Sequence, residues 1–384
     1  MSKTLVLAEK PSVGRELARV LGARKGGNGF LEGEKYIVTW ALGHLVTLAD
    51  PEVYGDEYKK WSFDTLPMLP DKMKLVVIKE TTKQYKTVKE LLLSPNVSDV
   101  IIATDAGREG ELVARWILEK AGCKKPLRRL WISSQTDKAI REGFAHLRDG
   151  KEYVPLCNAA KARAEADWLV GLNVTRALTC RHNAQLSAGR VQTPTLAIIV
   201  ERENEIKHFV PKDYFNLHAA FDGFRALYRN ADGVSALPER AAAEKLAQAV
   251  NGQNFTVSDV KSTEKRTPVL MLYDLTELQR DANKLFKMSP KETLSVMQRL
   301  YEVHKALTYP RTDSRYITED IVPTLYDRVR AASVGMLADT AKDILRSRRT
   351  ICKLCVNNEK VSDHHAIIPV SYTHLRAHET PEHL

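Results

Sequence analysis

The hydrophobic and polar positions in the first third of the chain predict strands that alternate with helices. An apolar strand over residues 4–8 is followed by a polar loop and by a helical pattern from Val13 that stops at Gly22. Buried strands that each lead into a helix predict an open parallel α/β sheet. Two further strands and a helix are predicted at residues 36–42, 100–103 and 109–120.

The rest of the chain is predicted to be mainly helical, with one β-rich interruption. Residues 154–208 have helical periodicity, whereas residues 209–270 contain strands at 214–221 and 255–260 that flank a helix near 239–250. Amphipathic helices follow at 275–286 and 291–305, and a helical region at 321–332. We therefore predict an α/β plus mainly-α multidomain fold, with domains at 1–150, 151–210, 211–272 and 273–370 and a tail at 371–384.

Two loops in the first part of the chain differ in what they indicate. Lys25-Gly-Gly-Asn-Gly29 is rich in glycine, but it follows a helix and lacks the Lys-Ser/Thr ending of a P-loop. It is therefore predicted to be a flexible turn, and ATP binding is not supported. The irregular stretch from Asp50 to Pro70 carries Trp61, and a loop of that length indicates function.

Acidic residues follow the ends of two predicted strands. Glu9 comes just after the first strand and Asp105 just after the strand at 100–103, with Glu109 a few residues later. Ligands of open parallel sheets bind at this edge, so the three carboxylates are expected in one crevice. The alternative is that Asp105 and Glu109 only complement the dipole at the start of a helix.

One tyrosine segment has the composition of a nucleophilic site. In Leu307-Thr-Tyr-Pro-Arg-Thr-Asp-Ser-Arg-Tyr316, Pro310 disfavours helix at Tyr309 and places that phenol on an extended or turn backbone. A phenol titrates near pH ~10, so its attack on a phosphodiester requires a proton acceptor and a cation, for which Arg311 is placed. The alternative is a surface turn, and Tyr316 is the next candidate nucleophile.

Composition adds modest constraints. Lys+Arg at 58 against Asp+Glu at 48 gives a net charge of +10, which suits a polyanion but also fits proteins that bind no nucleic acid. No signal peptide or membrane span is recognisable, so we expect a cytoplasmic protein. Five irregularly spaced cysteines predict reduced thiols. Cys352-x-x-Cys355 with His364 and His365 could imitate a zinc site.

Five motifs, in order, resemble the type IA DNA topoisomerases, most closely the topoisomerase III branch. The resemblance covers residues 1 to about 370, and it implies a Toprim domain with helical domains and a β-rich arch. In that family the tyrosine matched by Tyr309 becomes linked to the 5′ phosphate of one DNA strand. Besides the tyrosine segment, the motifs are Leu7-Ala-Glu-Lys-Pro-Ser12, Ala103-Thr-Asp-Ala-Gly-Arg-Glu-Gly-Glu111, Ser187-Ala-Gly-Arg-Val-Gln-Thr-Pro-Thr195 and Asp363-His-His-Ala-Ile-Ile-Pro369.

The resemblance implies that Glu9, Asp105 and Glu109 bind Mg²⁺, and that Glu9 also takes part in proton transfer. This chain has Gly107 where many relatives have a second aspartate, which implies weaker Mg²⁺ binding with Glu109 or Glu111 as a substitute. Lys10 is expected to hold the scissile phosphate or to protonate the leaving 3′ oxygen, with a solvated salt bridge as the alternative.

The resemblance also implies a grip on single-stranded DNA near the active site. Arg163 lies one helical turn before Asp167, so an ion pair within the helix is an alternative for it. Arginines are expected on phosphates and tryptophan on a base. The DNA-contacting residues implied are Trp61, Arg163, Trp168, Arg176, Ser187, Ala188, Gly189, Arg190, Val191, Gln192 and Arg311.

His364 matches the family histidine that lies near the catalytic tyrosine and fixes the phosphate or relays a proton, with His365 as the competing candidate. Family members are longer, so we expect an incomplete torus with exposed apolar edges. Two functions stay open. One is a Mg²⁺-dependent, ATP-independent topoisomerase, a nucleoid-associated monomer acting on single-stranded and negatively supercoiled DNA with a helicase as a candidate partner. The other is a basic DNA-binding fragment that binds or cleaves without strand passage.

Overall fold

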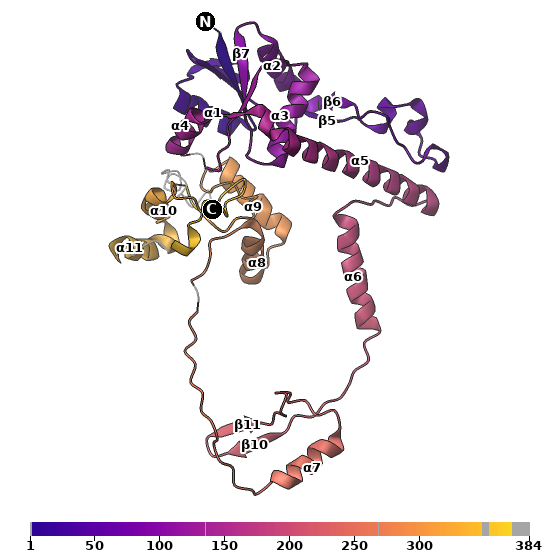
Figure 1. Ribbon diagram of the computed structural model, residues 1–384, viewed down its shortest axis with the longest axis vertical. Coiled ribbons are helices and arrows are strands. Elements are labelled where there is room, and N and C mark those ends of the chain that lie inside the picture. The colour runs from indigo at the N-terminus through magenta and orange to yellow at the C-terminus, as the bar shows by residue number, and fades with distance from the viewer. Residues whose placement is uncertain (1, 135, 268, 348–352, 371–384) are drawn as a thin grey trace. The chain divides into compact units, whose positions relative to one another are not determined.

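The computed structural model describes residues 2–134, 136–267, 269–347 and 353–370, and the chain divides into two compact units. The first unit is formed by Met1–Gly189 together with Val269–Leu384, and the second by Arg190–Pro268. Figure 1 shows the helices and strands of both. The chain therefore leaves the first unit, forms the second and then returns to the first.

A seven-stranded mixed sheet forms the centre of the first unit, in the order β2-β3-β4-β1-β7-β8-β9. Its middle strands are parallel and its edges are closed by antiparallel pairs. The parallel sheet predicted from the sequence is confirmed. The strands are β1 (Lys3–Ala8), β2 (Lys25–Gly27), β3 (Phe30–Glu32), β4 (Tyr36–Trp40), β7 (Val97–Ala103), β8 (Leu127–Arg129) and β9 (Arg148–Asp149).

Helices cover both faces of this sheet. Because side chains alternate along β1, Leu5 and Leu7 join the core beneath α2 (Thr82–Leu93) and α3 (Arg108–Ala121). Val6 and Ala8 join the core beneath α1 (Pro11–Leu21) and α4 (Asp137–Ala145). Each fully buried aliphatic side chain contributes about 1.5–3 kcal/mol to folding. Burial on both faces explains why β1 is an unbroken apolar run.

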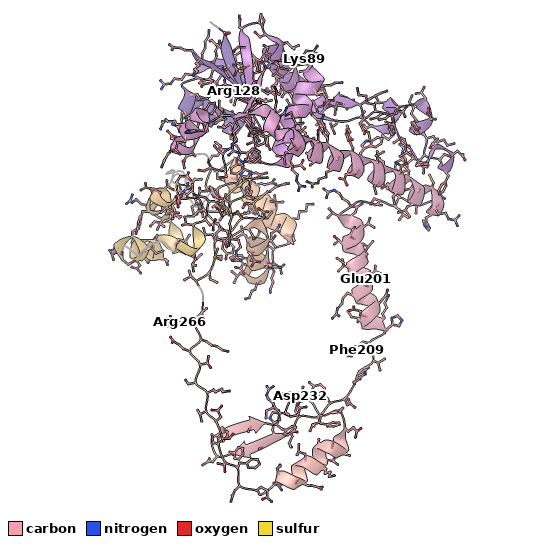
Figure 2. All side chains as sticks on the ribbon, viewed as in Figure 1. Lys89, Arg128, Glu201, Phe209, Asp232 and Arg266 are labelled. Carbon is pink, nitrogen blue, oxygen red and sulfur yellow. The ribbon has the colours of Figure 1, made fainter. Side chains whose placement is uncertain are left out.

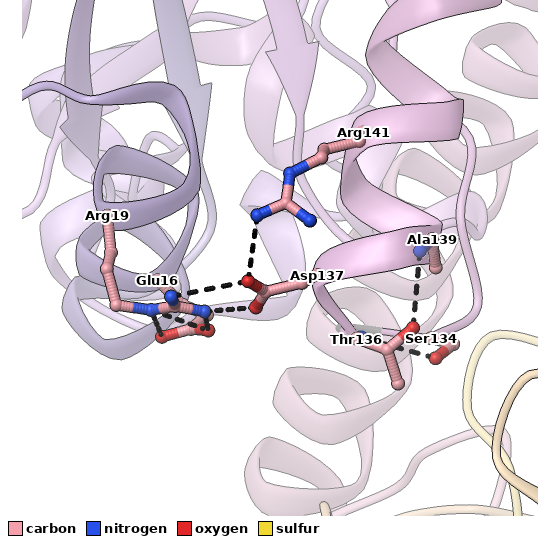
Figure 3. Close-up of polar contacts among 7 residues, drawn as sticks. All are labelled: Glu16, Arg19, Ser134, Thr136, Asp137, Ala139 and Arg141. Carbon is pink, nitrogen blue, oxygen red and sulfur yellow. Dashed lines mark hydrogen bonds and ion pairs between the residues drawn. The ribbon is translucent and has the colours of Figure 1, made fainter. Parts of the chain in front are cut away.

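The ends of α1 and α4 are fixed by local chemistry, as Figure 3 shows. The Thr136 hydroxyl accepts the backbone N–H of Ala139 and caps α4. The guanidinium of Arg19 on α1 pairs with Asp137 in the first turn of α4, which also pairs with Arg141 at 3.1 Å. Gly22 ends α1 at a φ of 73°, in the left-handed region that favours glycine, and the stop predicted there is confirmed.

The loop from 50 to 70 is irregular, as predicted, and α5 (Val154–His182) fixes one end of it. The Asn173 side chain accepts the Met68 N–H at 2.6 Å and donates to the Met68 carbonyl at 3.0 Å. The turn predicted over residues 25–29 is partly wrong, because residues 25–27 pair with β3 as an edge strand. Short elements in this part are β5 (Val46–Leu48), β6 (Leu75–Val77), η1 (Pro51–Val53), η2 (Asp56–Lys59), η3 (Phe63–Thr65), η4 (Lys79–Thr81) and η5 (Gly150–Tyr153).

The returning part of the first unit is helical. Ser289 and Glu292 form a capping box at the start of α9 (Pro290–Glu302), which leads into the tyrosine segment. A small core of Ile317, Ile321, Ala366 and Ile368 joins this segment to the histidine motif. The other elements are α8 (Leu275–Phe286), η6 (Val322–Thr324), α10 (Leu325–Ala331), η7 (Gly335–Leu337), α11 (Ala338–Ser347) and η8 (Lys353–Cys355).

The second unit is sparse. It contains α6 (Gln192–Lys207), the hairpin of β10 (His218–Phe221) and β11 (Phe224–Leu227), and α7 (Arg240–Val250). The strand predicted at 255–260 is wrong, since these residues pair with no neighbouring strand. Figure 2 marks Glu201, Phe209 and Arg266 in this region, and Phe209 is 71% exposed. The helical stretch predicted at 154–208 is two helices separated by residues 183–191.

Candidate active site

Two neighbouring parallel strands deliver the acidic residues to one place. Ala8 at the end of β1 is in register with Ala103 at the end of β7, so the residues that follow meet at the same edge of the sheet. The Asp105 N–H donates to the Glu9 carboxylate at 3.0 Å. Lys10 Nζ lies 3.5 Å from Asp105 Oδ2. The structure thus brings together Glu9, Lys10 and Asp105.

The tyrosine segment reaches this edge by pairing with the histidine motif. Thr308 donates its N–H to the Ile368 carbonyl at 3.0 Å, and Thr312 donates its hydroxyl to the His364 carbonyl at 2.8 Å. Between these two anchors Tyr309 lies on irregular backbone, as Pro310 predicts. The two motifs, more than fifty residues apart in sequence, are held side by side.

Three side chains surround the Tyr309 ring. The His364 ring centre lies 4.4 Å from that of Tyr309, and Lys10 Nζ lies 3.8 Å from the same point. The Tyr301 ring packs edge-on at 5.3 Å. His364 Nε2 also lies 3.2 Å from Asp105 Oδ2. The phenol is therefore next to a cation and to an imidazole that contacts the acidic residues.

The protonation of this cluster is set by burial and by its neighbouring charges. Burial and then the charge of Asp105 raise the pKa of Glu9 to about 7. Burial acts in the same direction on Asp105, but His364 and Lys10 outweigh it and lower the pKa of that carboxyl. The pKa of Lys10 is raised, because Asp105, Tyr309 and Glu9 together outweigh its burial. Glu9 can therefore hold a proton near neutral pH beside an ionised Asp105.

A buried ion pair supports the loop that carries Asp105. Arg129 and Glu111 are both 0% exposed, and Arg129 Nε lies 3.1 Å from Glu111 Oε2 without the alignment of a hydrogen bond. The Arg129 guanidinium donates to the carbonyls of Thr104 at 2.7 Å and of Asp105 at 2.6 Å. Arg129 thus fixes the backbone from which Asp105 projects. Sequence reasoning missed it, because a basic residue at the end of a short strand gives no sign of burial.

Sequence comparisons place these residues in a known family. Residues 4–135 match the model of the Toprim domain, and residues 151–383 match the model described as DNA topoisomerase. The chain belongs to the DNA topoisomerase family. DNA topoisomerase 3 of Bacillus licheniformis is 58% identical over 370 residues and that of Bacillus subtilis 57%. Each match covers 96% of this chain and 51% of the relative, so the chain spans about half the length of these topoisomerases.

A solved structure supports the same fold. Full-length topoisomerase I from Thermotoga maritima matches with a TM-score of 0.58 and 22% identity, over 99% of this chain and 56% of that one. The Toprim domain and the type IA topoisomerase fold predicted from the five motifs are confirmed. In the described parts of the chain, no helix combines the length and apolar character that crossing a membrane would need.

The donor set at the sheet edge fits Mg²⁺. Glu9 and Asp105 supply oxygen ligands, and Mg²⁺ is commonly held by one or two carboxylates while it keeps several waters. Within the described residues, no three His, Cys, Asp or Glu side chains converge closely enough to chelate an ion by themselves. A further carboxylate, that of Asp363, lies against Gly107, in space that a Cβ there would fill.

The structure separates the other metal candidates. Glu109 projects from α3, is 58% exposed at its side chain and pairs with Arg163 on α5 at 3.0 Å. Glu111 lies inside the fold between Arg115 at 2.8 Å and Arg129. The suggestion that Glu111 replaces a missing ligand is therefore wrong. Arg163 therefore pairs with Glu109 on α3, instead of forming the ion pair that was considered within α5.

Of the two histidines, the structure brings His364 to the tyrosine. His365 Nδ1 lies 2.7 Å from the Ala366 carbonyl, and burial lowers its pKa. The alternative zinc site includes Cys352, which lies outside the described residues. Of the other cysteines, Cys123, Cys157 and Cys180 are free thiols, as predicted.

Arg311 and Tyr316 lie in different surroundings. Arg311 is exposed, and in the described part of the chain no ion pair involves it. Tyr316 has Lys360 over its ring at 5.1 Å, and its hydroxyl lies 3.4 Å from that lysine. Within the described residues, Tyr316 contacts neither Lys10 nor the acidic residues, which favours Tyr309 as the nucleophile.

Two residues expected to hold DNA are engaged inside the fold. Arg176 is 2% exposed, donates to the Tyr58 carbonyl at 2.9 Å and lies 5.1 Å from the ring centre of Trp61. Trp168 donates its indole N–H to the Ala49 carbonyl at 3.1 Å and packs on the core. A phosphate contact for Arg176 is therefore wrong, because a buried guanidinium cannot meet a phosphate. Trp61, at 43% exposed, remains accessible.

The remaining DNA-binding candidates lie after α5. The Ala188 N–H donates to the Thr175 hydroxyl at 3.0 Å, which holds the segment against that helix. Ala188 and Gly189 are partly buried, whereas Ser187, Arg190, Val191 and Gln192 are exposed.

Proposed function

We propose that the chain is a type IA topoisomerase that cleaves one strand of DNA by transesterification to Tyr309, passes DNA through the break and reseals it. The observation that carries the proposal is the position of the Tyr309 phenol beside Lys10 and His364, at the sheet edge that holds Glu9 and Asp105. A nucleophile, a phosphate-binding cation and proton carriers are the parts that this reaction requires.

In the proposed step a bond forms between the phenol oxygen and phosphorus, and the bond from phosphorus to the 3′ oxygen breaks. The strand is left linked to Tyr309 through its 5′ phosphate. The phenol loses one proton and the 3′ oxygen gains one, so charge and atoms balance. Reversal of the same step reseals the strand without ATP.

Each proton has a carrier in the cluster. His364 Nε2 lies 3.2 Å from Asp105 Oδ2, and a proton held on this nitrogen would leave the lone pair on Nδ1 to accept the phenol proton. Glu9, with its pKa raised to about 7, holds the proton that the 3′ oxygen needs. Lys10 and Arg311 bind the scissile phosphate, where negative charge develops.

Bound Mg²⁺ would supply positive charge next to the DNA phosphates, with Glu9 and Asp105 holding it and Glu109 at the periphery. Trp61, Arg163, Ser187 and the residues to Gln192 are proposed to contact single-stranded DNA, through stacking and phosphate contacts. From the family resemblance of its motifs, we further propose a monomer that acts on negatively supercoiled DNA, is associated with the nucleoid and has a helicase as a partner.

An oligonucleotide that traps cleavage tests the proposal. A single strand labelled at its 3′ end is cut near its 5′ end, so that the short product with a free 3′ hydroxyl diffuses away and labelled covalent protein–DNA adduct accumulates. Tyr309→Phe should form no adduct and should keep DNA binding. Tyr301→Phe, which removes a phenol whose ring lies 5.3 Å away, is the matched control and should keep cleaving. Adduct on the Tyr309→Phe protein would show that another residue is the nucleophile.

A second candidate is a DNA-binding chain that cleaves but does not pass strands, and the match to about half of each relative favours testing it. Relaxation of negatively supercoiled plasmid, measured beside the adduct assay, separates the two. Adduct with relaxation supports a complete topoisomerase reaction, whereas adduct without relaxation supports the second candidate.

A further inference from the structure

The space beside Gly107 is occupied by the Asp363 carboxylate, whereas the backbone at this position does not need glycine. Gly107 has a φ of −159° and a ψ of 179°, an extended conformation that any residue can adopt. A Cβ built on it would lie 2.1 Å from Asp363 Oδ2 and 2.6 Å from Oδ1. Real Cβ atoms do not approach other atoms so closely, so a side chain at 107 would displace the Asp363 carboxylate from its present position.

This carboxylate is placed at the acidic end of the site. The Gly107 N–H donates to the Asp105 carbonyl at 2.9 Å, which folds the two residues into one tight turn. Asp363 directly precedes His364, whose Nε2 lies 3.2 Å from Asp105 Oδ2. The segment that contains Asp363 therefore brings a carboxylate to the turn at Gly107. Many relatives carry an aspartate at position 107 itself.

We propose that Asp363 takes the metal-facing role of the carboxylate that is absent at position 107, acting with Asp105 on Mg²⁺ and its water shell. The proposal rests on the proposed function only in the identity of the ion. Mg²⁺ prefers oxygen ligands and retains much of its water, so an acid that projects from another segment can hold it through one of those waters. The three acids of the site are then Glu9, Asp105 and Asp363.

The origin of Asp363 has a consequence for affinity. Glu9 and Asp105 follow strands of the sheet, whereas Asp363 belongs to the segment that pairs with Tyr309. The metal site is therefore complete only when that segment is docked against the sheet. The affinity for Mg²⁺ therefore reports whether the Asp363 segment is docked against the sheet, and it can be measured without DNA.

The test is Mg²⁺ binding to the purified, DNA-free chain by isothermal titration calorimetry, repeated with Mn²⁺ by electron paramagnetic resonance. Asp363→Asn keeps the shape and removes the charge, and it should weaken binding about 10-fold or more. Asp313→Asn is the matched control, because Asp313 is an exposed acid near Asp363 that accepts the Ser362 hydroxyl at 2.6 Å. Loss of its exposed charge should change affinity only about two- to threefold.

A second variant moves the acid back. In the double variant Gly107→Asp with Asp363→Gly, the new aspartate occupies the space that the Asp363 side chain fills in the wild type. This variant should restore the affinity for Mg²⁺ to within about threefold of the wild type. Circular dichroism and melting in EDTA check that each variant is folded. Equal effects of Asp363→Asn and Asp313→Asn would overturn the proposal, as would a folded double variant that binds no better than Asp363→Asn. Neither measurement involves Tyr309, so the Mg²⁺-binding result stands whether or not the chain cleaves DNA.

Discussion

Glu111→Gln should destabilise the protein strongly without weakening its metal site. The change keeps the size of the side chain and removes one charge from a fully buried pair with Arg129, while the second partner, Arg115, is close to the surface. Because Arg129 is 0% exposed, its guanidinium is left charged in the interior, where it keeps its hydrogen bonds to backbone carbonyls.

The size of the effect follows from that geometry. At an effective dielectric constant of about 20, opposite charges 3.1 Å apart attract by about 5 kcal/mol, and desolvation of both ions offsets part of this. Removing one member of a buried pair typically costs about 3–5 kcal/mol. The carbonyls that Arg129 still contacts place the expected loss near the lower value, about 3 kcal/mol.

The assay is urea unfolding in EDTA, followed by tryptophan fluorescence, since Trp116 lies on α3 and Trp131 is next to Arg129. Glu109→Gln is the control, because Glu109 lies two residues away and its pair with Arg163 is exposed. It should cost at most about 1 kcal/mol. If Glu111→Gln lost less than that, or if its folded form bound Mg²⁺ markedly more weakly than the wild type, the structural role assigned to Glu111 would be refuted.

Four further predictions concern residues of the active site and Arg176. The raised pKa of Glu9 contributes to the free energy of unfolding below pH 4.5, and this contribution is lost as the pH rises to about 7. Glu9→Gln in EDTA should therefore gain at most about 3 kcal/mol in free energy of unfolding over wild type across that range. Urea unfolding at each pH measures this difference. A flat difference would show that Glu9 is not perturbed. Arg311→Ala should slow single-turnover cleavage at saturating DNA about 10²- to 10³-fold, and an unchanged rate would reduce Arg311 to a positioning contact. Arg176→Ala should instead lower the melting temperature, because Trp61 loses its contact with the guanidinium, and the salt dependence of DNA binding should stay unchanged. A shallower salt dependence would show that Arg176 does contact a phosphate. Asp105→Asn should shift the magnesium dependence of resealing to higher concentration, and an unchanged magnesium titration would remove Asp105 from the site.

The sequence predicts what depends on local pattern and strand order. The apolar runs that end at Ala8 and Ala103 define two buried strands, and parallel pairing then places Glu9 beside Asp105. Tyr309 was recognisable because Pro310 and the family motif identify its backbone and its chemistry. His364 could not be separated from His365, since adjacent residues differ only in the direction of their side chains.

Contacts between distant segments could not be predicted. Arg176 is predicted to bind a phosphate, yet the loop that carries Trp61 folds over it. Asp320 accepts hydrogen bonds from Ser134 at 2.7 Å and Thr136 at 2.8 Å, joining segments more than 180 residues apart. Asp363 belongs to the same class, because only the folded chain shows that its carboxylate fills the space at Gly107.

The division of the first unit between two stretches of chain imposes an order on synthesis. Asp105 leaves the ribosome about 200 residues before Tyr309, and at roughly 5–20 residues per second the interval is about 10–40 s. During that time the sheet can fold with its carboxylates in place, while the phenol has not yet been made. A nascent chain halted anywhere between residues 190 and 268 therefore has Glu9 and Asp105 but neither Asp363 nor the nucleophile, and it cannot leave a break in DNA.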